Sequence, residues 1–342
     1  MILVTGGTGL VGAHLLLHLV EKENRVRAIY RQAYRIEYTM KLFSLYEKDH
    51  LFRKIEWVQA DITDVSSLEK AFEDIYFVFH CAALISYDPK DEKQLRKVNI
   101  EGTANIVNLC LDYNIFRLCH VSSIAALGDL AGHEKQITEE TEWNPEAPHS
   151  DYAISKYGAE MEIWRGREEG LDVVIVNPGI VFGPGFWKDG SSLFFSSVEK
   201  GFPFYTKGTT GYVGVDDLVK IMIQLLRVYE SGERYIVVAE NLSFQEVIFT
   251  IADKLQVKKP KTEAKPWMLS LAWRWDWFLS TFFKTKRRLS KYSALALTSA
   301  DFISNEKIKK QLNYEFQSMD SVIEEVIQLS KKPITVLEEY QD

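Results

Sequence analysis

The 342-residue sequence has few cysteines, no long apolar run and no excess of positive charge. Its three cysteines, Cys81, Cys110 and Cys119, are widely spaced in apolar surroundings. They fit buried, reduced thiols better than a disulfide framework or a metal site. The net charge of −7 argues against nucleic acid as the main partner. No apolar run reaches the roughly eighteen uncharged residues of a membrane-spanning helix.

The chain also lacks a recognisable signal peptide, internal repeats and low-complexity linkers. Residue 2 already begins a stretch of strand type, whereas a signal peptide starts with a basic segment. Hydrophobic residues make up 46% and charged residues 26% of the chain, an ordinary globular balance. We therefore expect a cytoplasmic protein with one large domain, or with one domain and a smaller lobe.

The first twenty residues contain the clearest motif in the sequence. Residues 1–5 are apolar, residues 6–12 read Gly-Gly-Thr-Gly-Leu-Val-Gly, and residues 13–20 have an amphipathic helical pattern. Glycine lets the backbone approach a phosphate, and a helix N-terminus offers free N–H groups and a positive dipole end. The order of strand, glycine turn and helix predicts a dinucleotide site rather than an unliganded turn. Its predicted contacts are Gly6, Thr8, Gly9, Leu10, Val11 and Gly12.

The end of the expected second strand, residues 26–30, carries arginine where an acidic residue would bind the ribose of NAD. Tyr30 and Arg31 stand there, with Arg27 and Arg35 nearby. A guanidinium pairs well with a 2′-phosphate through charge and parallel hydrogen bonds. Arg31 therefore favours NADP over NAD as the cofactor. The alternative is that Arg31 only covers the adenine ring.

Strand and helix patterns then alternate along the chain. Strands are expected at 55–59, 76–80, 116–121 and 172–176, and helices at 34–50, 65–73, 91–113 and 152–169. This alternation is typical of an α/β fold with a doubly wound parallel sheet of Rossmann type. In such folds ligands bind at the carboxyl ends of the strands.

Several residues at those strand ends could contact a cofactor. Asp61, followed by Ile62, could accept a hydrogen bond from the adenine amino group, or Asp61 or Thr63 could cap the next helix. His80 could be an acid–base group or simply a satisfied buried residue. Cys81, Ala82 and Ala83 are small residues, which would let the backbone approach a cofactor. The remaining candidate contacts later in the chain are Asn99 and Ser122. Asn99 could bridge backbone groups or order a water near the site, or be a plain helix-packing amide.

Tyr152 and Lys156 form the strongest chemical signal. They are four residues apart on an expected helix and therefore share one face. A tyrosine has an ordinary pKa near 10, and a neighbouring ammonium group should lower that pKa toward the working range. Ser123, at the end of the fifth expected strand, could hold the substrate oxygen. A rigid loop after the sixth strand could form one wall of the nicotinamide pocket through Pro178, Gly179, Ile180 and Val181.

Together these motifs resemble the extended branch of the short-chain dehydrogenase/reductase superfamily. Matching segments include Thr5 to Gly12, the 80–83 segment, Tyr152-x-x-x-Lys156 and the loop from Pro178 to Pro184. Residues 212–219 and 307–316 are similar to later family segments. The resemblance implies a parallel sheet of about seven strands, formed by residues 1–180 with 212–240 returning to it, and a smaller C-terminal substrate lobe from 181–211 and 241–342. Members often dimerise through helices equivalent to 91–113 and 151–169.

The resemblance also implies hydride transfer between nicotinamide and a carbonyl or carbinol carbon, with Tyr152 as general acid or base. Lys156 would hold the ribose and tune Tyr152, and Ser123 would orient the substrate oxygen. The Asp-Glu pair that sugar-nucleotide dehydratases carry after the catalytic serine is missing here, and Ile180 replaces the asparagine common in epimerases. Residues 26–31 instead resemble dihydroflavonol reductases and 3β-hydroxysteroid dehydrogenases. We therefore expect an NADP-dependent oxidoreductase for an apolar small molecule, with a sugar epimerase or a non-catalytic NADP sensor as alternatives.

An unusual aromatic run lies at residues 266–283 and is followed by basic residues up to 291. Pro266 suits a helix start, whereas Arg274 and Asp276 disfavour a membrane span. Three interpretations remain open from the sequence. The segment could be a helix packed on the core of its own lobe, a lid over an apolar substrate, or a peripheral helix at the surface of an anionic membrane through residues 266–291.

Overall fold

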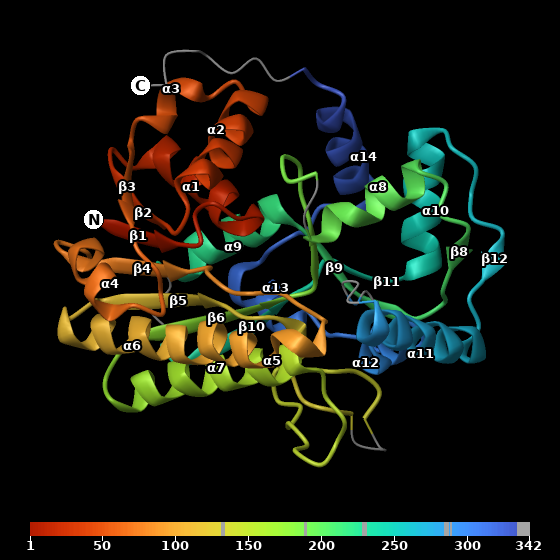
Figure 1. Ribbon diagram of the computed structural model, residues 1–342. Helices are drawn as coiled ribbons and strands as arrows, with labels where there is room; N and C mark the ends of the chain where they lie inside the picture. The colour runs from red at the N-terminus through yellow and green to blue at the C-terminus, as the bar shows by residue number, and fades with distance from the viewer. Residues whose placement is uncertain (131–133, 188–189, 228–230, 284–286, 288, 334–342) are drawn as a thin grey trace.

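A parallel sheet of seven strands forms the centre of the protein, as the computed structural model shows (Figure 1). The structure describes residues 1–130, 134–187, 190–227, 231–283, 287 and 289–333. The strand order β10-β6-β5-β4-β1-β2-β3 confirms the predicted α/β class and the doubly wound sheet of Rossmann type. The strands are β1 (Ile2–Thr5), β2 (Val26–Tyr30), β3 (Ile55–Gln59), β4 (Phe77–His80), β5 (Arg117–Val121), β6 (Val173–Pro178) and β10 (Glu233–Val237).

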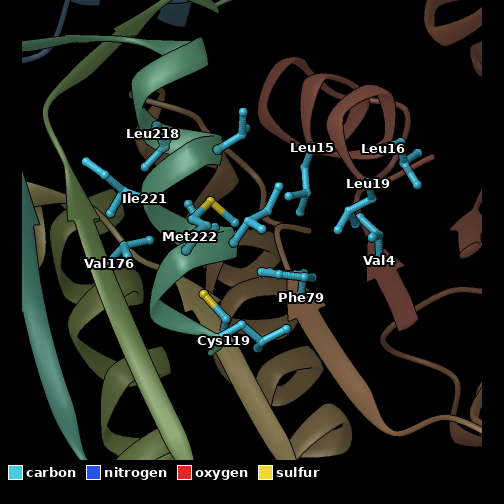
Figure 2. Packing of buried hydrophobic residues seen from close by; sticks show 14 of the residues in the cluster. Val4, Leu15, Leu16, Leu19, Phe79, Cys119, Val176, Leu218, Ile221 and Met222 are labelled. Carbon is cyan, nitrogen blue, oxygen red and sulfur yellow. The ribbon is translucent and has the colours of Figure 1, made fainter. Parts of the chain in front are cut away.

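Helices cover both faces of this sheet (Figure 1). On one face lie α1 (Leu10–Lys22), α2 (Ile36–Leu45) and α9 (Val215–Leu225), and on the other lie α4 (Val65–Phe72), α6 (Gly102–Asp112) and α7 (Asp151–Glu168). Figure 2 shows Leu15 of α1 and Met222 of α9 directed toward Phe79 and Cys119 of the sheet. All four side chains are fully buried or nearly so. Parallel strands covered on both faces explain why the strand sequences are almost wholly apolar.

Two of the expected helices are less regular than their patterns indicated. The helix expected at 34–50 consists of a 3-10 turn, η1 (Ala33–Arg35), then α2 and a short α3 (Asp49–Phe52). Glu47 interrupts it with a φ of 58°, which a right-handed helix cannot contain. The expected helix 91–113 comprises α5 (Glu92–Leu95), the π-helical segment η3 (Arg96–Glu101) and α6, with η2 (Pro89–Asp91) before it. The π-helical segment contains Asn99, a residue of the candidate site.

A smaller part of the molecule is built from short strands and C-terminal helices. One sheet joins β7 (Ile180–Phe182), β9 (Thr209–Gly214) and β11 (Glu240–Ser243), and a second joins β8 (Phe204–Tyr205) and β12 (Thr262–Glu263). Helices α8 (Leu193–Glu199), α10 (Phe244–Leu255) and α14 (Met319–Ser330) pack around an apolar cluster there. Ser243 caps α10 in a reciprocal arrangement with Glu246, a capping box that fixes the start of this helix.

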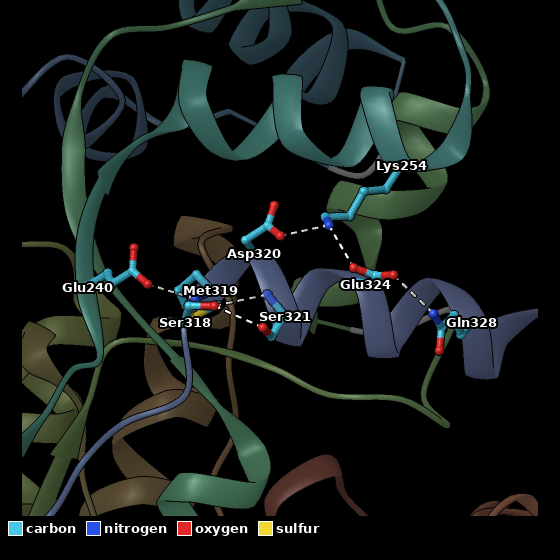
Figure 3. Close-up of polar contacts among 8 residues, drawn as sticks. All are labelled: Glu240, Lys254, Ser318, Met319, Asp320, Ser321, Glu324 and Gln328. Carbon is cyan, nitrogen blue, oxygen red and sulfur yellow. Dashed lines mark hydrogen bonds and ion pairs between the residues drawn. The ribbon is translucent and has the colours of Figure 1, made fainter.

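Polar contacts fasten α14 to its neighbours. Lys254 of α10 pairs with Asp320 and Glu324 at 2.8 and 3.0 Å, and the Met319 N–H donates to Glu240 (Figure 3). Before α14, α13 (Glu306–Leu312) packs on β10, and the Tyr314 hydroxyl donates to Asp217 of α9 at 2.8 Å. The C-terminal segment therefore contacts both the central sheet, through α13, and the smaller part of the molecule, through α14.

The aromatic run forms α11 (Pro266–Phe282), with α12 (Lys291–Ala296) after it. Only Leu269 and Ser280 of α11 are buried, whereas Trp267, Leu271 and Trp275 are 60–65% exposed. The interpretation of this segment as a helix packed on its own core is therefore wrong, because its aromatic side chains face outward. Among the described residues, no helix is long and apolar enough to cross a membrane.

Candidate active site

The glycine turn folds tightly against the neighbouring strand end. Gly6 has a φ of +70°, and a Cβ there would lie 2.7 Å from the backbone nitrogen of Ala82. A Cβ on Gly12 would lie 2.2 Å from the carbonyl oxygen of Gly6. Gly9 is the N-cap of α1, and its own Cβ position has only one atom within 4 Å, at 3.5 Å. Gly6 and Gly12 are therefore required by packing, whereas the backbone at Gly9 is open to a ligand.

The start of α1 is arranged like an anion site. Among the described residues, no side chain caps the helix, and its first turn contains no acidic residue. Thr8, Leu10 and Val11 are half-buried, and Leu10 and Val11 also pack on the core. The free N–H groups and the positive dipole end of this 13-residue helix therefore point to the edge where β1 and β4 end.

His80 belongs to a closed hydrogen-bond chain at that edge. The backbone N–H of Ala82 donates to the Thr5 hydroxyl, which lies 2.7 Å from His80 Nδ1, and His80 Nε2 lies 3.0 Å from the Thr103 hydroxyl. The Thr103 hydroxyl donates its proton to the Asn99 carbonyl, so it accepts from His80 Nε2–H, and the Thr5 hydroxyl then donates to Nδ1. Burial, with a smaller contribution from Lys156, lowers the pKa of His80 to about 3. His80 is thus neutral and engaged at both nitrogens, which supports the structural alternative.

The segment after β4 presents mainly backbone to the site. Cys81 and Ala82 are half-buried and Ala83 is exposed. Burial raises the pKa of the Cys81 thiol to about 12, so Cys81 stays protonated near neutral pH. Asn99 bridges the two polar backbone atoms of Leu84 and also donates to the Ser155 hydroxyl at 2.9 Å. This is the backbone-bridging role that the sequence left open beside simple helix packing.

Arg31 and Asp61 meet at the ends of β2 and β3. The Arg31 guanidinium lies 4.0 Å from the Asp61 carboxylate, and its side chain is 59% exposed. Asp61 also accepts hydrogen bonds from the backbone and hydroxyl of Thr63, at 2.9 Å each. The N-cap of α4 is Asp64 rather than Asp61 or Thr63. Ile62 beside them is buried.

Arg27, by contrast, does not reach this site. Its guanidinium is buried and binds Glu56 and the carbonyl oxygens of Ala71 and Glu73. It therefore fastens β2 to β3 and to the end of α4. Arg27 is close to Arg31 in the sequence, but its guanidinium is held in these contacts and is therefore not available to a cofactor.

Tyr152 and Ser123 come together from α7 and the end of β5. Ser150 caps α7 by accepting from the Ala153 N–H, so Tyr152 stands in the first turn. Tyr152 is buried, and the Tyr87 ring lies 5.7 Å from its ring. Burial raises the pKa of Tyr152 above its ordinary value, Tyr87 adds to the rise, and a hydrogen bond with Ser123 opposes it. The lowered pKa that we expected for Tyr152 is therefore wrong in this structure, because desolvation dominates.

Lys156 is buried one turn further along α7. Its ammonium donates to the Val121 carbonyl at 2.8 Å, and burial lowers its pKa to about 8, against an upward effect of Glu160. Glu160 is fully buried and accepts from the Asn177 amide at 2.6 Å. The same amide nitrogen lies 3.0 Å from the Ser123 carbonyl oxygen, so this network connects the catalytic helix with the ends of β5 and β6.

Two of the residues near Tyr152 were missed from the sequence. The spacing of Tyr152, Lys156 and Glu160 at every fourth position was a signal that Glu160 shares their face. Tyr87 carries no comparable signal, because it lies in an irregular segment and meets Tyr152 only through the fold. Ser122, which was predicted, is buried directly after β5.

The loop after β6 lies between the two parts of the molecule. Pro178 is buried at the end of β6, and Ile180 and Val181 are half-buried in β7, which pairs with β9. A Cβ on Gly179 would lie 2.3 Å from the Gly211 carbonyl oxygen. This close contact explains why glycine separates the two strands.

A small pocket adjoins Tyr152, with a volume of about 10 Å³. Its walls come from the segment before η2, the start of α7 and the start of α12: Ser86, Tyr87, Pro89, Ser150, Asp151, Tyr152, Ser290 and Tyr292. No basic side chain is present among these lining residues. Tyr87 and the start of α12 therefore lie directly beside Tyr152 in this pocket.

Comparison with known proteins agrees with this arrangement. The NAD dependent epimerase/dehydratase family matches residues 2–239. A dihydroflavonol 4-reductase-like protein of Synechocystis sp. is 30% identical over 277 residues, which span 79% of this chain and 77% of that protein. The UDP-glucose 4-epimerase of Vibrio cholerae is 28% identical over 263 residues, 73% of this chain and 74% of the epimerase. The protein in the crystal structure of gox2253 is 26% identical in sequence and superposes with a TM-score of 0.79. The match covers 96% of this chain and 97% of that chain.

The chain therefore belongs to the NAD dependent epimerase/dehydratase family, the extended short-chain dehydrogenase/reductases, whose members are NAD(P)-dependent enzymes.

Proposed function

We propose that the protein is an NADP-dependent oxidoreductase that interconverts an apolar ketone or aldehyde with its alcohol. The observation that carries the proposal is the burial of Tyr152 beside Ser123, with Lys156 one turn away, at the carboxyl edge of the sheet. A bound nicotinamide would supply or accept the hydride. The glycine turn and the start of α1 would hold its pyrophosphate.

Tyr152 is proposed as the group that exchanges a proton with the substrate oxygen. Its raised pKa keeps the phenol protonated at neutral pH, which suits a general acid in the reductive direction. Ser123 would orient the substrate oxygen through its hydroxyl. Lys156 would place a positive charge near the ribose, with Glu160 keeping that charge in place against burial.

The remaining predicted cofactor contacts follow from the same placement. Asp61 and Ile62 would face the adenine, Arg31 the 2′-phosphate, and residues 81–83, Asn99 and Ser122 the central part of the dinucleotide. Pro178, Gly179, Ile180 and Val181 would lie beside the nicotinamide. The exposed Arg31 guanidinium, rather than an acidic residue, at the end of β2 supports NADP over NAD.

The pocket beside Tyr152 contains a carboxylate, Asp151, but no basic side chain, which weighs against a nucleotide sugar as the substrate. A diphosphate group would need positive charge, and none of the residues lining the pocket beside Tyr152 is basic. Ile180 also stands where many epimerases have asparagine. Three free cysteines, two of them buried, agree with a reducing, cytoplasmic environment.

Calorimetric titration with NADPH and then NADH tests the cofactor assignment. We expect NADPH to bind more tightly, and Arg31→Ala to weaken NADPH binding about 10- to 100-fold while leaving NADH binding nearly unchanged, because charged hydrogen bonds contribute about 1.5–3 kcal/mol. Arg35→Ala, one turn away in η1, is the matched control and should have a smaller effect. Equal binding of the two cofactors, unaffected by Arg31→Ala, would contradict the NADP assignment.

A panel of apolar ketones and aldehydes tests the reaction itself. Consumption of NADPH with one of these substrates supports the reductase. Cofactor that copurifies with the protein and is not consumed during turnover would instead favour the epimerase, which oxidises and re-reduces one carbon without net use of NADPH. Binding of NADPH without any turnover would favour the sensor.

A further inference from the structure

Helix α11 carries an apolar stripe on its outer side. Its members follow the helical spacing i, i+4, i+8, i+11 and i+15 and are between 39% and 65% exposed: Trp267, Leu271, Trp275, Phe278 and Phe282. This spacing places them along one face. Neighbouring rings within the stripe touch, because Trp275 stacks on Phe278 and Phe278 packs on Phe282.

The opposite face of α11, which meets the rest of the protein, is partly polar. The buried Ser280 carbonyl accepts a hydrogen bond from Lys90 at 3.2 Å. Asp276 accepts from the Leu289 N–H at 2.9 Å. A helix on the surface of a soluble domain normally buries its apolar face and exposes its polar face. In α11 this arrangement is inverted, so the stripe is available to something outside the described part of the chain.

The composition of the stripe suits a lipid interface. Four of the eight tryptophans of the protein, at positions 267, 273, 275 and 277, lie in this one helix. Further apolar side chains of the same helix, among them Met268, Leu271 and Phe278, lie beside these tryptophans. Tryptophan is favoured at the boundary between lipid and water because its ring is apolar and its N–H is polar.

The positive charge around α11 favours an anionic lipid surface over a neutral one. Residues 257–291 contain ten Lys and Arg and two acidic residues, a net charge of +8 in a protein whose total is −7. Exposed basic side chains among the described residues are Lys258, Lys259, Lys261, Lys265, Arg274 and Lys291. Lys284, Lys286 and Arg288 lie outside the described residues. A basic segment beside an exposed aromatic stripe attracts an anionic bilayer.

Two other occupants fit less well. A second copy of the chain would bring two segments of charge +8 together, which is unfavourable without anions between them. A substrate under a lid would lie on the inner side, whereas the stripe faces outward and contributes nothing to the pocket beside Tyr152. We propose that the outer face of α11 docks on the surface of an anionic lipid membrane, with the stripe in the interface and the basic side chains at the phosphates.

Docking would hold the mouth of the active site close to the bilayer. Helix α11 packs on α12, whose first residues line the pocket beside Tyr152. Lys90, which binds the carbonyl of Ser280, belongs to the η2 segment that follows Tyr87. The membrane contact and the pocket are therefore joined by directly packed elements.

Flotation of the full-length protein with lipid vesicles tests the docking. Vesicles of phosphatidylcholine alone are compared with vesicles that also contain phosphatidylglycerol. We expect at least about tenfold tighter binding to the anionic vesicles, weakened by added salt, and a blue shift of tryptophan fluorescence. The variant Trp267→Gln, Leu271→Gln, Trp275→Gln should lose at least about tenfold in this binding.

A double variant, Tyr76→Gln with Phe116→Gln, is the matched control. These two rings are also exposed and stack on each other, but they lie at the amino end of the sheet strands, away from α11. The control should bind anionic vesicles like the wild type. NADPH binding, measured on every variant, reports whether the fold is intact. Vesicle binding is measured without turnover, so it can fail or succeed independently of the proposed reaction.

Three results would overturn the proposal. The first is wild-type protein that stays with the lipid-free fraction, or that binds neutral and anionic vesicles equally. The second is an α11 variant that binds as well as the wild type while still binding NADPH. The third is a dimer that the α11 substitutions dissociate, without vesicle binding, which would make a second copy the occupant.

Discussion

Helices α1 and α11 both carry an apolar stripe, but the two stripes have opposite fates. Leu15, Leu16 and Leu19 of α1 are at most 4% exposed, because α1 packs on the central sheet beside α9 (Figure 2). Trp267 and Leu271 of α11 are about 60% exposed. An apolar stripe at helical spacing therefore predicts that this face of the helix will be covered. It does not say whether the protein's own core or another surface covers it.

The two regions also differ in their chemistry. The region around α1 and α7 holds the buried titratable groups, including three neutral histidines and the Tyr152, Lys156 and Glu160 series. Residues 257–291 contain no histidine. We therefore expect the reaction, the folding stability and the pH sensitivity to depend on the first region, and the lipid contact alone to depend on the second.

The largest expected effect is that of Tyr152→Phe on turnover. Loss of the phenol should lower kcat/KM for any accepted ketone by about 10²- to 10⁴-fold, the usual contribution of a general acid. NADPH binding, followed by calorimetry, should remain. Tyr87→Phe keeps a ring against Tyr152 and is the control. Full activity of Tyr152→Phe would remove the assignment of this residue as the acid or base.

A pair of leucine substitutions tests the comparison of the two stripes directly. Leu15→Ala should reduce the free energy of unfolding by about 2–5 kcal/mol, because it leaves a cavity in a fully buried position. Leu271→Ala, at a position 60% exposed, should change that free energy by less than about 0.5 kcal/mol. Urea unfolding measures both. A large loss for Leu271→Ala would mean that the α11 stripe is covered by the protein in solution.

The last expected effect is the acid sensitivity of the α1 region. Burial lowers the pKa of His14 to about 4, and a contact of His14 Nε2 with the Pro184 carbonyl only partly opposes this. Below pH 6.5 the unfolded chain takes up a proton at this residue and the folded chain does not. Stability is therefore lost as the pH falls from about 6.5 to about 4, by about 1.4 kcal/mol per pH unit for this residue.

Urea unfolding of wild type and His14→Gln at several pH values measures that contribution. The difference in unfolding free energy between the two proteins gives the contribution of His14, because the contribution of the carboxylates is the same in both proteins. Wild type should lose stability relative to the variant over this window and should not do so above pH 7. A constant difference across the window would show that His14 takes up its proton equally in the folded and the unfolded chain, so that burial does not lower its pKa.

Much of the fold could be predicted from local sequence. The glycine turn, the alternation of strands and helices, and the start of α10 at Ser243 depend on spacings of a few residues. The placement of Ser123 near Tyr152 was also foreseeable, because both follow strands that end at the same edge of a parallel sheet. Glu160 could have been found by the same four-residue spacing.

Other features depended on contacts between distant residues. Arg27 and Arg31 are only four positions apart, yet one is buried against Glu56 and the other is exposed beside Asp61. The expected effect of Lys156 on the pKa of Tyr152 was outweighed by burial and by Tyr87, which lies 65 positions earlier in the chain (87 to 152). No local pattern reports how deeply a side chain is desolvated.

The sequence by itself determined the elements of this protein, the turn that suits a dinucleotide, and the residues that share the face of α7. These follow from backbone geometry, which repeats every two residues in a strand and every 3.6 residues in a helix. Only the tertiary structure decided which apolar stripe is buried, which arginine is exposed and which way the pKa of Tyr152 moves. Burial and long-range contacts arise when whole elements pack, so they depend on residues far apart in the chain.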